Sequence, residues 1–141
     1  MGWIPYAVGS AVALAAADFF IKLASGKLSN SLGLLIYGSC TFVAGLSWVV
    51  LDKFRGMSLR AQAAGVLCAT GVGVSFSLVT IGLYLTFGAS APITLASPFI
   101  RVGGLLLASV AGLILLNEPL TLRYTLGMIL AVCGVYLIIT R

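Results

Sequence analysis

The chain has 141 residues, of which 61% are hydrophobic and only 8% are charged, with a formal net charge of +5. Its mean hydropathy of +1.19 excludes a water-soluble globular domain, because no aqueous fold of this size could bury so much apolar surface. The basic residues are scattered, which gives no support to nucleic-acid binding. We therefore expect an integral membrane protein with the lipid bilayer as its surroundings.

Five stretches are long enough to cross a membrane. A helix that spans the hydrocarbon core needs about 20 mostly apolar residues. Short connectors with Gly, Asn and Pro separate the stretches and leave no room for a soluble lobe. The expected fold is one all-α domain over residues 1–141, with five transmembrane helices at about 4–25, 31–51, 61–87, 89–116 and 121–140.

The first span carries two charges at membrane depth. Asp18 lies four residues before Lys22, so both face one side of the helix with the acid first, which is the favourable order. The pair could be structural, with Lys22 extending its ammonium to the interface. Alternatively, Asp18 lies about 9 Å inside the span, where charges mark functional sites, and exchanges a proton or contacts substrate. No Lys or Arg precedes Lys22, so a cleaved signal peptide is not expected.

The boundary between the third and fourth spans decides the number of helices. Residues 86–92 carry no charge, and the turn expected there rests on Gly88, Ser90 and Pro92. Without that turn the two spans would merge, and the number of helices would be four.

The fourth span holds Arg101 near its middle, three residues after Pro98. Its guanidinium stays protonated and needs an acid, backbone carbonyls or an anionic substrate as partner. Asp18 is the acid available at that depth. Pro92 and Pro98 interrupt backbone hydrogen bonding, which is tolerated where a helix lines a cavity. Polar side chains that could line such a cavity are Tyr37, Thr94 and Ser97.

An odd number of spans places the two termini on opposite sides of the membrane. With the N-terminus inside, four basic residues fall in inside loops and three in outside segments, a weak bias that permits both orientations. Two such units in opposite orientation form an inverted repeat, the usual architecture of secondary transporters. The chain is therefore interpreted as half of a transporter, completed by homodimerisation, preferably antiparallel.

Small residues at a spacing of four mark helix faces that allow close approach. Such stripes either hold one chain together or join two copies, and the last span is the best candidate for a contact between copies. The stripes are Gly65, Ala69, Gly73 and Ser77 in the third span, Gly104, Ala108 and Gly112 in the fourth, and Gly127 and Ala131 in the fifth, which Gly134 extends at a spacing of three.

The remaining conspicuous residues have structural explanations. Glu118 follows the fourth span at the water boundary, where an acid caps a helix or sets topology at little cost. There is no histidine, nucleotide-binding loop or nucleophile constellation, so neither enzyme activity nor a cofactor or metal is expected. Interfacial anchoring is expected of Trp3, Tyr6, Trp48 and Tyr124, and packing of the isolated Cys40, Cys68 and Cys133.

Five short motifs support a family resemblance. They are Lys-Leu-Ala-Ser-Gly at 22–26, Ser-Pro-Phe at 97–99, Leu-Asn-Glu-Pro-Leu-Thr at 116–121, Leu-Gly at 126–127 and Cys-Gly-Val at 133–135. The last four resemble the EamA-like domain of the drug/metabolite transporter superfamily. The first resembles the end of the first helix across that superfamily, including the small multidrug resistance proteins.

The resemblance implies a membrane transporter of small molecules that works by alternating access, with a single five-helix repeat acting as a dimer. It makes Glu118 a structural feature of the family. Aligning Lys22 with the corresponding lysine of small multidrug resistance proteins places Leu14 where those proteins have a membrane-embedded glutamate. Asp18 lies one turn further on, so proton-coupled export of cationic drugs is not carried over to this chain.

Two functions are expected from these observations. The first is a half-size transporter of a small metabolite. Such a multi-pass protein is expected in a prokaryotic inner membrane. The second is a non-transporting membrane subunit or lipid-carrier flippase component that needs a different partner chain.

Overall fold

The computed structural model describes residues 2–59, 61–117, 119 and 121–140. It is all-helical, and each of its five helices is long and apolar enough to span a membrane, as predicted for a multi-pass membrane protein. The helices fall into two units, one up to Ser90 and one from Ala91 onward. The helices are α1 (Ile4–Ala24), α2 (Asn30–Phe54), α3 (Ala63–Gly88), α4 (Ile93–Leu115) and α5 (Leu122–Ile139).

The turn between α3 and α4 lies where the sequence predicted it, but α4 begins at Ile93 rather than Ala89. Ser90 has φ of +66°, a left-handed conformation that ends the regular helix. Pro92 is the N-cap residue of α4, with φ of −69°. Its missing N–H costs nothing there, because the first helical turn has no backbone acceptor for it.

The second helix extends beyond the expected end at residue 51 to Phe54 and closes with a Schellman motif. Gly56 has φ of +72°, and its N–H donates to the carbonyl of Lys53 at 3.1 Å. The N–H of Met57 donates to the carbonyl of Asp52 at 3.0 Å. These two bonds satisfy carbonyls in the last turn, so the helix continues through the charged residues.

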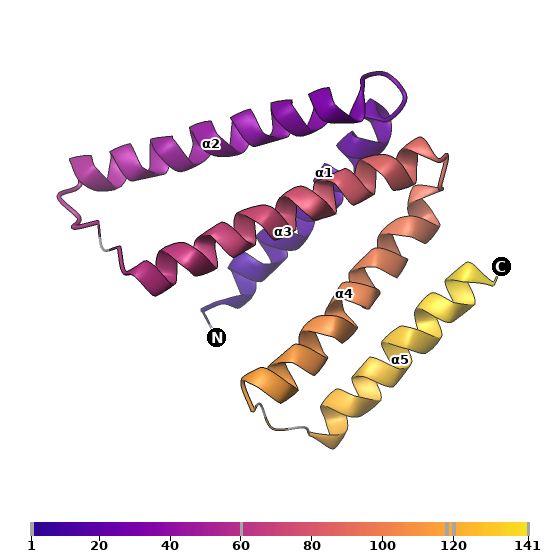
Figure 1. Cartoon of the computed structure of the whole chain (residues 1–141). Coiled ribbons are helices and arrows are strands. Elements are labelled where there is room, and N and C mark those ends of the chain that lie inside the picture. Colours follow the sequence, from indigo (N-terminus) through magenta and orange to yellow (C-terminus); the bar gives the residue numbers. More distant parts are fainter. Residues whose placement is uncertain (1, 60, 118, 120, 141) are drawn as a thin grey trace. The chain divides into compact units, whose positions relative to one another are not determined.

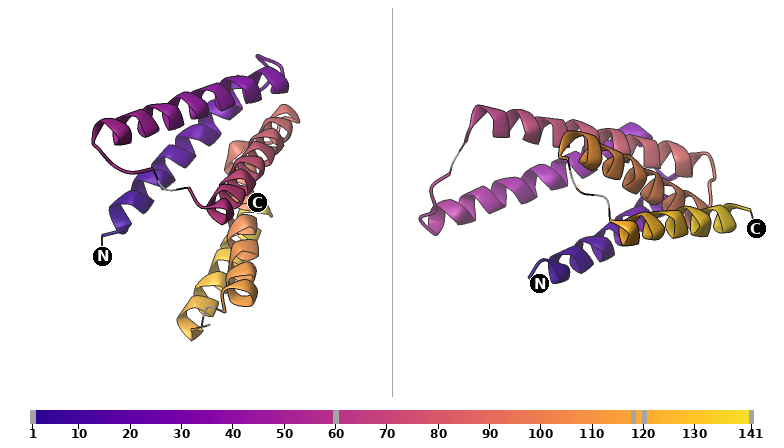
Figure 2. Two further views of the ribbon diagram at one scale, coloured as in Figure 1. Left: turned by 60° about the vertical axis from the view of Figure 1, so that its left-hand side comes forward. Right: turned by 90° about the horizontal axis from the view of Figure 1, so that it is seen from below.

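In the first unit, α3 packs against both α1 and α2, and its buried residues lie at one end. Thr80, Leu83, Tyr84 and Phe87 are buried at the spacing of a single helix face. Figures 1 and 2 show that α1 and α2 meet at the short loop between them and separate toward their other ends. The described buried residues of α1 and α2 are Asp18, six residues before the end of α1, and Gly33, near the start of α2.

The opposite end of this unit is open. Trp3 and Tyr6 on α1, Trp48 on α2 and Leu67 on α3 are all between 69% and 79% exposed within the chain. Gly65 and Gly73 belong to the predicted stripe of α3, and an added Cβ at either position would meet no described atom within 4 Å. The stripe therefore does not hold the described first unit together by close backbone contact.

In the second unit, α4 and α5 form a helical hairpin. Asn117 turns the chain with φ of +51°, and the side chain of Thr121 caps α5 by accepting from the N–H of Tyr124 at 3.3 Å. The hydroxyls of Ser109 and Tyr124 join the two helices by a short hydrogen bond. Tyr124 is thus a contact between helices, in addition to its predicted place near a span end.

Candidate functional site

Asp18 is the most deeply buried polar side chain of the described chain, with 2% of its surface exposed. It belongs to α1, which begins at Ile4 with Pro5 in its first turn, a position that suits proline because no N–H is needed there. Six residues separate Asp18 from the helix end at Ala24, a rise of about 9 Å. The carboxyl of Asp18 is therefore held inside the protein, within a helix that is long and apolar enough to span a membrane.

Lys22 lies one helical turn after Asp18 and reaches α3. Its Nζ lies 5.5 Å from the centre of the Phe87 ring, within the range of a cation–π interaction. Phe87 itself is only 3% exposed, so the ring forms a wall beside the ammonium. The ammonium of Lys22 is therefore stabilised inside the first unit by an aromatic face, and its alkyl stem need not extend the charge into water.

The wall continues with Tyr84 and Thr80 on the same face of α3. Tyr84 lies so close to Gly33 of α2 that an added Cβ would come within 2.5 Å of its ring carbon Cζ. Thr80 donates its hydroxyl to the carbonyl of Phe76 at 2.8 Å, which satisfies the group within its own helix. These α3 residues were not among the predicted site residues, although their spacing follows one helix face.

Ser25 closes the cluster at the end of α1. Its Oγ is buried and makes no hydrogen bond among the residues that the structure describes. It lies near Gly88, where an added Cβ would be 3.6 Å away. We call Asp18, Lys22, Ser25, Tyr84 and Phe87 the α1–α3 cluster: an acid, an amine, two hydroxyls and two aromatic rings at the closed end of the first unit.

Tyr37 belongs to a different place on the first unit. It lines a groove of about 420 Å³ between α2 and α3, together with Gly38, Phe76 and others, and Asp18 is not in its lining. The hydroxyl of Thr41 in this groove donates to the carbonyl of Tyr37 at 2.9 Å, and Ser77 donates to Gly73 in the same way. The lining of the groove is therefore largely apolar.

The other predicted site residues belong to the second unit. Thr94, Ser97 and Arg101 share one face of α4 by their spacing of three and four residues. Pro98 lies inside the same helix and has no N–H to donate to the carbonyl of Thr94, yet α4 continues through it without a break. The proposed pair of Arg101 with Asp18 stays a prediction, and Glu118 lies outside the described residues.

The chemistry available differs from that of a metal site. Within residues 2–59, 61–117, 119 and 121–140, no group of three His, Cys, Asp or Glu side chains could hold a metal ion. The α1–α3 cluster instead holds a carboxyl and an amine, groups that can pair with a charged ligand. It also holds two aromatic rings, which can cover an apolar ligand. A comparison with protein-family models, curated proteins and solved structures gives no match to the chain.

Proposed function

We propose that the chain is a half-size transporter of a small molecule, which acts by alternating access as a dimer and uses Asp18 for coupling. The observation that carries this proposal is the carboxyl of Asp18, 2% exposed inside a helix that is apolar enough to span a membrane. Ionisable groups at membrane depth are costly, and they recur in substrate paths and proton relays.

The surroundings of Asp18 support an exchange role. Lys22, the partner expected from the sequence, has its ammonium 5.5 Å from the ring centre of Phe87. The aromatic face stabilises the amine independently of the carboxyl. A change of the ligand at Asp18 would therefore leave Lys22 the stabilisation that the ring of Phe87 provides.

The shape of the first unit supports alternating access. Its helices are packed at the end that holds Asp18 and separate toward the other end, where their side chains are exposed. A second copy in the opposite orientation would place a closed end at each membrane face. Rocking of one copy against the other would then open a site between them to one side of the membrane and then to the other, as in inverted-repeat transporters.

A transport assay tests the coupling role. The full chain is reconstituted into vesicles that contain a pH-sensitive dye, and a metabolite panel is added from outside. We expect a substrate to move protons in the wild type, no proton movement in Asp18→Asn, and movement restored in Asp18→Glu. Circular dichroism and gel filtration verify that each variant is folded. Equal pH-dependent transport by the wild type and Asp18→Asn would show that the coupling role is wrong.

A labelling assay tests the dimer. Single cysteines are placed at each terminus after Cys40, Cys68 and Cys133 are replaced, and intact cells and inside-out membrane vesicles are each treated with an impermeant reagent. An antiparallel homodimer predicts that each terminus is labelled from both sides. Strictly one-sided labelling would contradict the antiparallel form, and a monomer in mild detergent and in cross-linked membranes would contradict the dimer altogether.

A further inference from the structure

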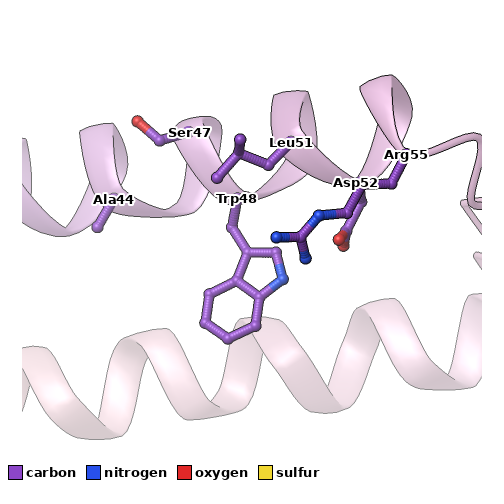
Figure 3. A pocket seen from close by; sticks show the side chains of 6 residues that line it. All are labelled: Ala44, Ser47, Trp48, Leu51, Asp52 and Arg55. Atoms are coloured by element: carbon purple, nitrogen blue, oxygen red, sulfur yellow. The ribbon is translucent and has the colours of Figure 1, made fainter.

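A second hollow lies on α2, at the end opposite to the α1–α3 cluster. It has a volume of about 310 Å³, and its lining residues come from the last three turns of this helix and its C-cap residue, Arg55. Figure 3 shows the indole of Trp48 projecting from α2, with the guanidinium of Arg55 turned back toward it and the carboxylate of Asp52 alongside. The lining consists of Ala44, Ser47, Trp48, Leu51, Asp52 and Arg55.

The lining changes from apolar to charged along the helix. Ala44 and Leu51 form the apolar part, and Ser47 adds no free donor because its hydroxyl bonds the carbonyl of Val43 at 2.8 Å. Asp52 and Arg55 follow at the end of the span, where α2 closes. Trp48 lies between Ala44 and Leu51 along the helix, about one turn before Asp52, and indole rings favour the membrane–water interface. The hollow thus runs from an apolar stretch of α2 to its charged end, the same order as the acyl chain and headgroup of a lipid.

The two charges at the rim have opposite sign. Asp52 and Arg55 are three residues apart on one helix face, and neither forms an ion pair within the part of the chain that the structure describes. Asp52 is half-buried, whereas Arg55 is exposed. A guanidinium binds phosphate through paired N–H groups, and a carboxylate accepts from an ammonium. The rim therefore suits a ligand that carries both charges a few atoms apart.

We propose that this hollow binds the headgroup of phosphatidylethanolamine. Arg55 binds the phosphate, Asp52 accepts hydrogen bonds from the primary ammonium, and Trp48 covers the glycerol and upper acyl chain with its ring. Phosphatidylglycerol has the phosphate but no ammonium, so Asp52 disfavours it by charge. Phosphatidylcholine has a quaternary nitrogen without N–H, so it cannot donate to Asp52.

Native mass spectrometry of the full chain tests this proposal. The protein is extracted from vesicles with equal amounts of phosphatidylethanolamine, phosphatidylglycerol and phosphatidylcholine, and the lipids that stay bound are counted. We expect phosphatidylethanolamine to be retained about fivefold over each of the others, the magnitude of an exposed charge pair. Asp52→Asn should abolish the preference over phosphatidylglycerol, and Arg55→Gln should lower retention of all three lipids.

Lys53→Gln is the matched control, because it removes one positive charge next to Asp52 from a residue outside this hollow. The control should retain the wild-type preference. Equal retention of the three lipids by the wild type, a preference for phosphatidylglycerol, or an unchanged preference in Asp52→Asn would each overturn the proposal. A loss in Lys53→Gln as large as that in Arg55→Gln would show general attraction by positive charge and overturn it as well.

Discussion

Tyr84 of α3 occupies the space in front of the Cα of Gly33 of α2, so that a Cβ at residue 33 would lie 2.7 Å from the tyrosine hydroxyl oxygen. Both residues are buried. The absence of a side chain at Gly33 is therefore a condition for the contact between α2 and α3, and it fixes the closed end of the first unit.

Gly33→Ala is expected to destabilise the protein by about 1–3 kcal/mol, because the methyl group forces the packed ring of Tyr84 to move. Thermal unfolding in detergent measures the effect. Gly38→Ala is the matched control on the same helix, since an added Cβ there meets no described atom within 4 Å. Tyr84→Leu in the Gly33→Ala background should recover part of the loss. Equal effects of the two alanine substitutions would contradict the contact.

Replacing Phe87 should weaken the hold on Lys22. Phe87→Leu removes the aromatic face and keeps an apolar side chain, so a double-mutant cycle with Lys22→Gln should give a coupling of about 0.5–1 kcal/mol. The same cycle with Phe76→Leu, on the same helix but exposed, serves as the control and should give no coupling. Additive effects of Phe87→Leu and Lys22→Gln would rule out the interaction.

Ser90→Gly should stabilise the turn between α3 and α4 by about 1 kcal/mol, because Ser90 has φ of +66°, which costs a residue with a side chain more than glycine. Ser29→Gly is the control: Ser29 precedes α2 with φ of −66°, so glycine there gains nothing and adds flexibility. Chemical unfolding measures both variants. A loss of stability in Ser90→Gly would be inconsistent with the left-handed turn.

Tyr124→Phe should loosen the α4–α5 hairpin by about 0.6 kcal/mol, the usual value for a hydrogen bond between membrane helices. Ser109 donates its one hydroxyl hydrogen to the carbonyl of Leu105 at 2.7 Å, so Tyr124 is the donor between the helices. Tyr136→Phe on the exposed side of α5 is the control. Faster hydrogen exchange of α5 amides in Tyr124→Phe alone would support the bond; identical exchange in both variants would refute it.

The number and type of helices could be predicted from the sequence because the bilayer fixes both the length and the polarity of a span. The turn at Ser90 and Pro92 was predicted from residue types that favour turns. The expected end of α2 at residue 51 is three residues too early, because the charged residues Asp52 and Lys53 favour a connector there. The Schellman motif at Gly56 carries the helix past Asp52 and Lys53.

The packing face of α3 could not be predicted in the same way. This helix is apolar on every side, so no polar face marks which side is buried. The sequence drew attention to the small residues Gly65 and Gly73, whereas the structure buries Tyr84 and Phe87 near the helix end. Asp18 was predicted as a charge at membrane depth, because a carboxyl in an apolar run stands out without any knowledge of its neighbours; its burial within the protein is a finding of the structure.

The separation of α1, α2 and α3 away from their closed end has a consequence for the surrounding membrane. Hydrocarbon leaves no vacuum between helices, so in a bilayer other apolar groups, from lipid tails or from protein, must fill the space beside Trp48 and Leu67. The first unit is thus asymmetric along its helices: its own side chains supply the core at one end, and at the other end the spacing of the helices depends on what surrounds them.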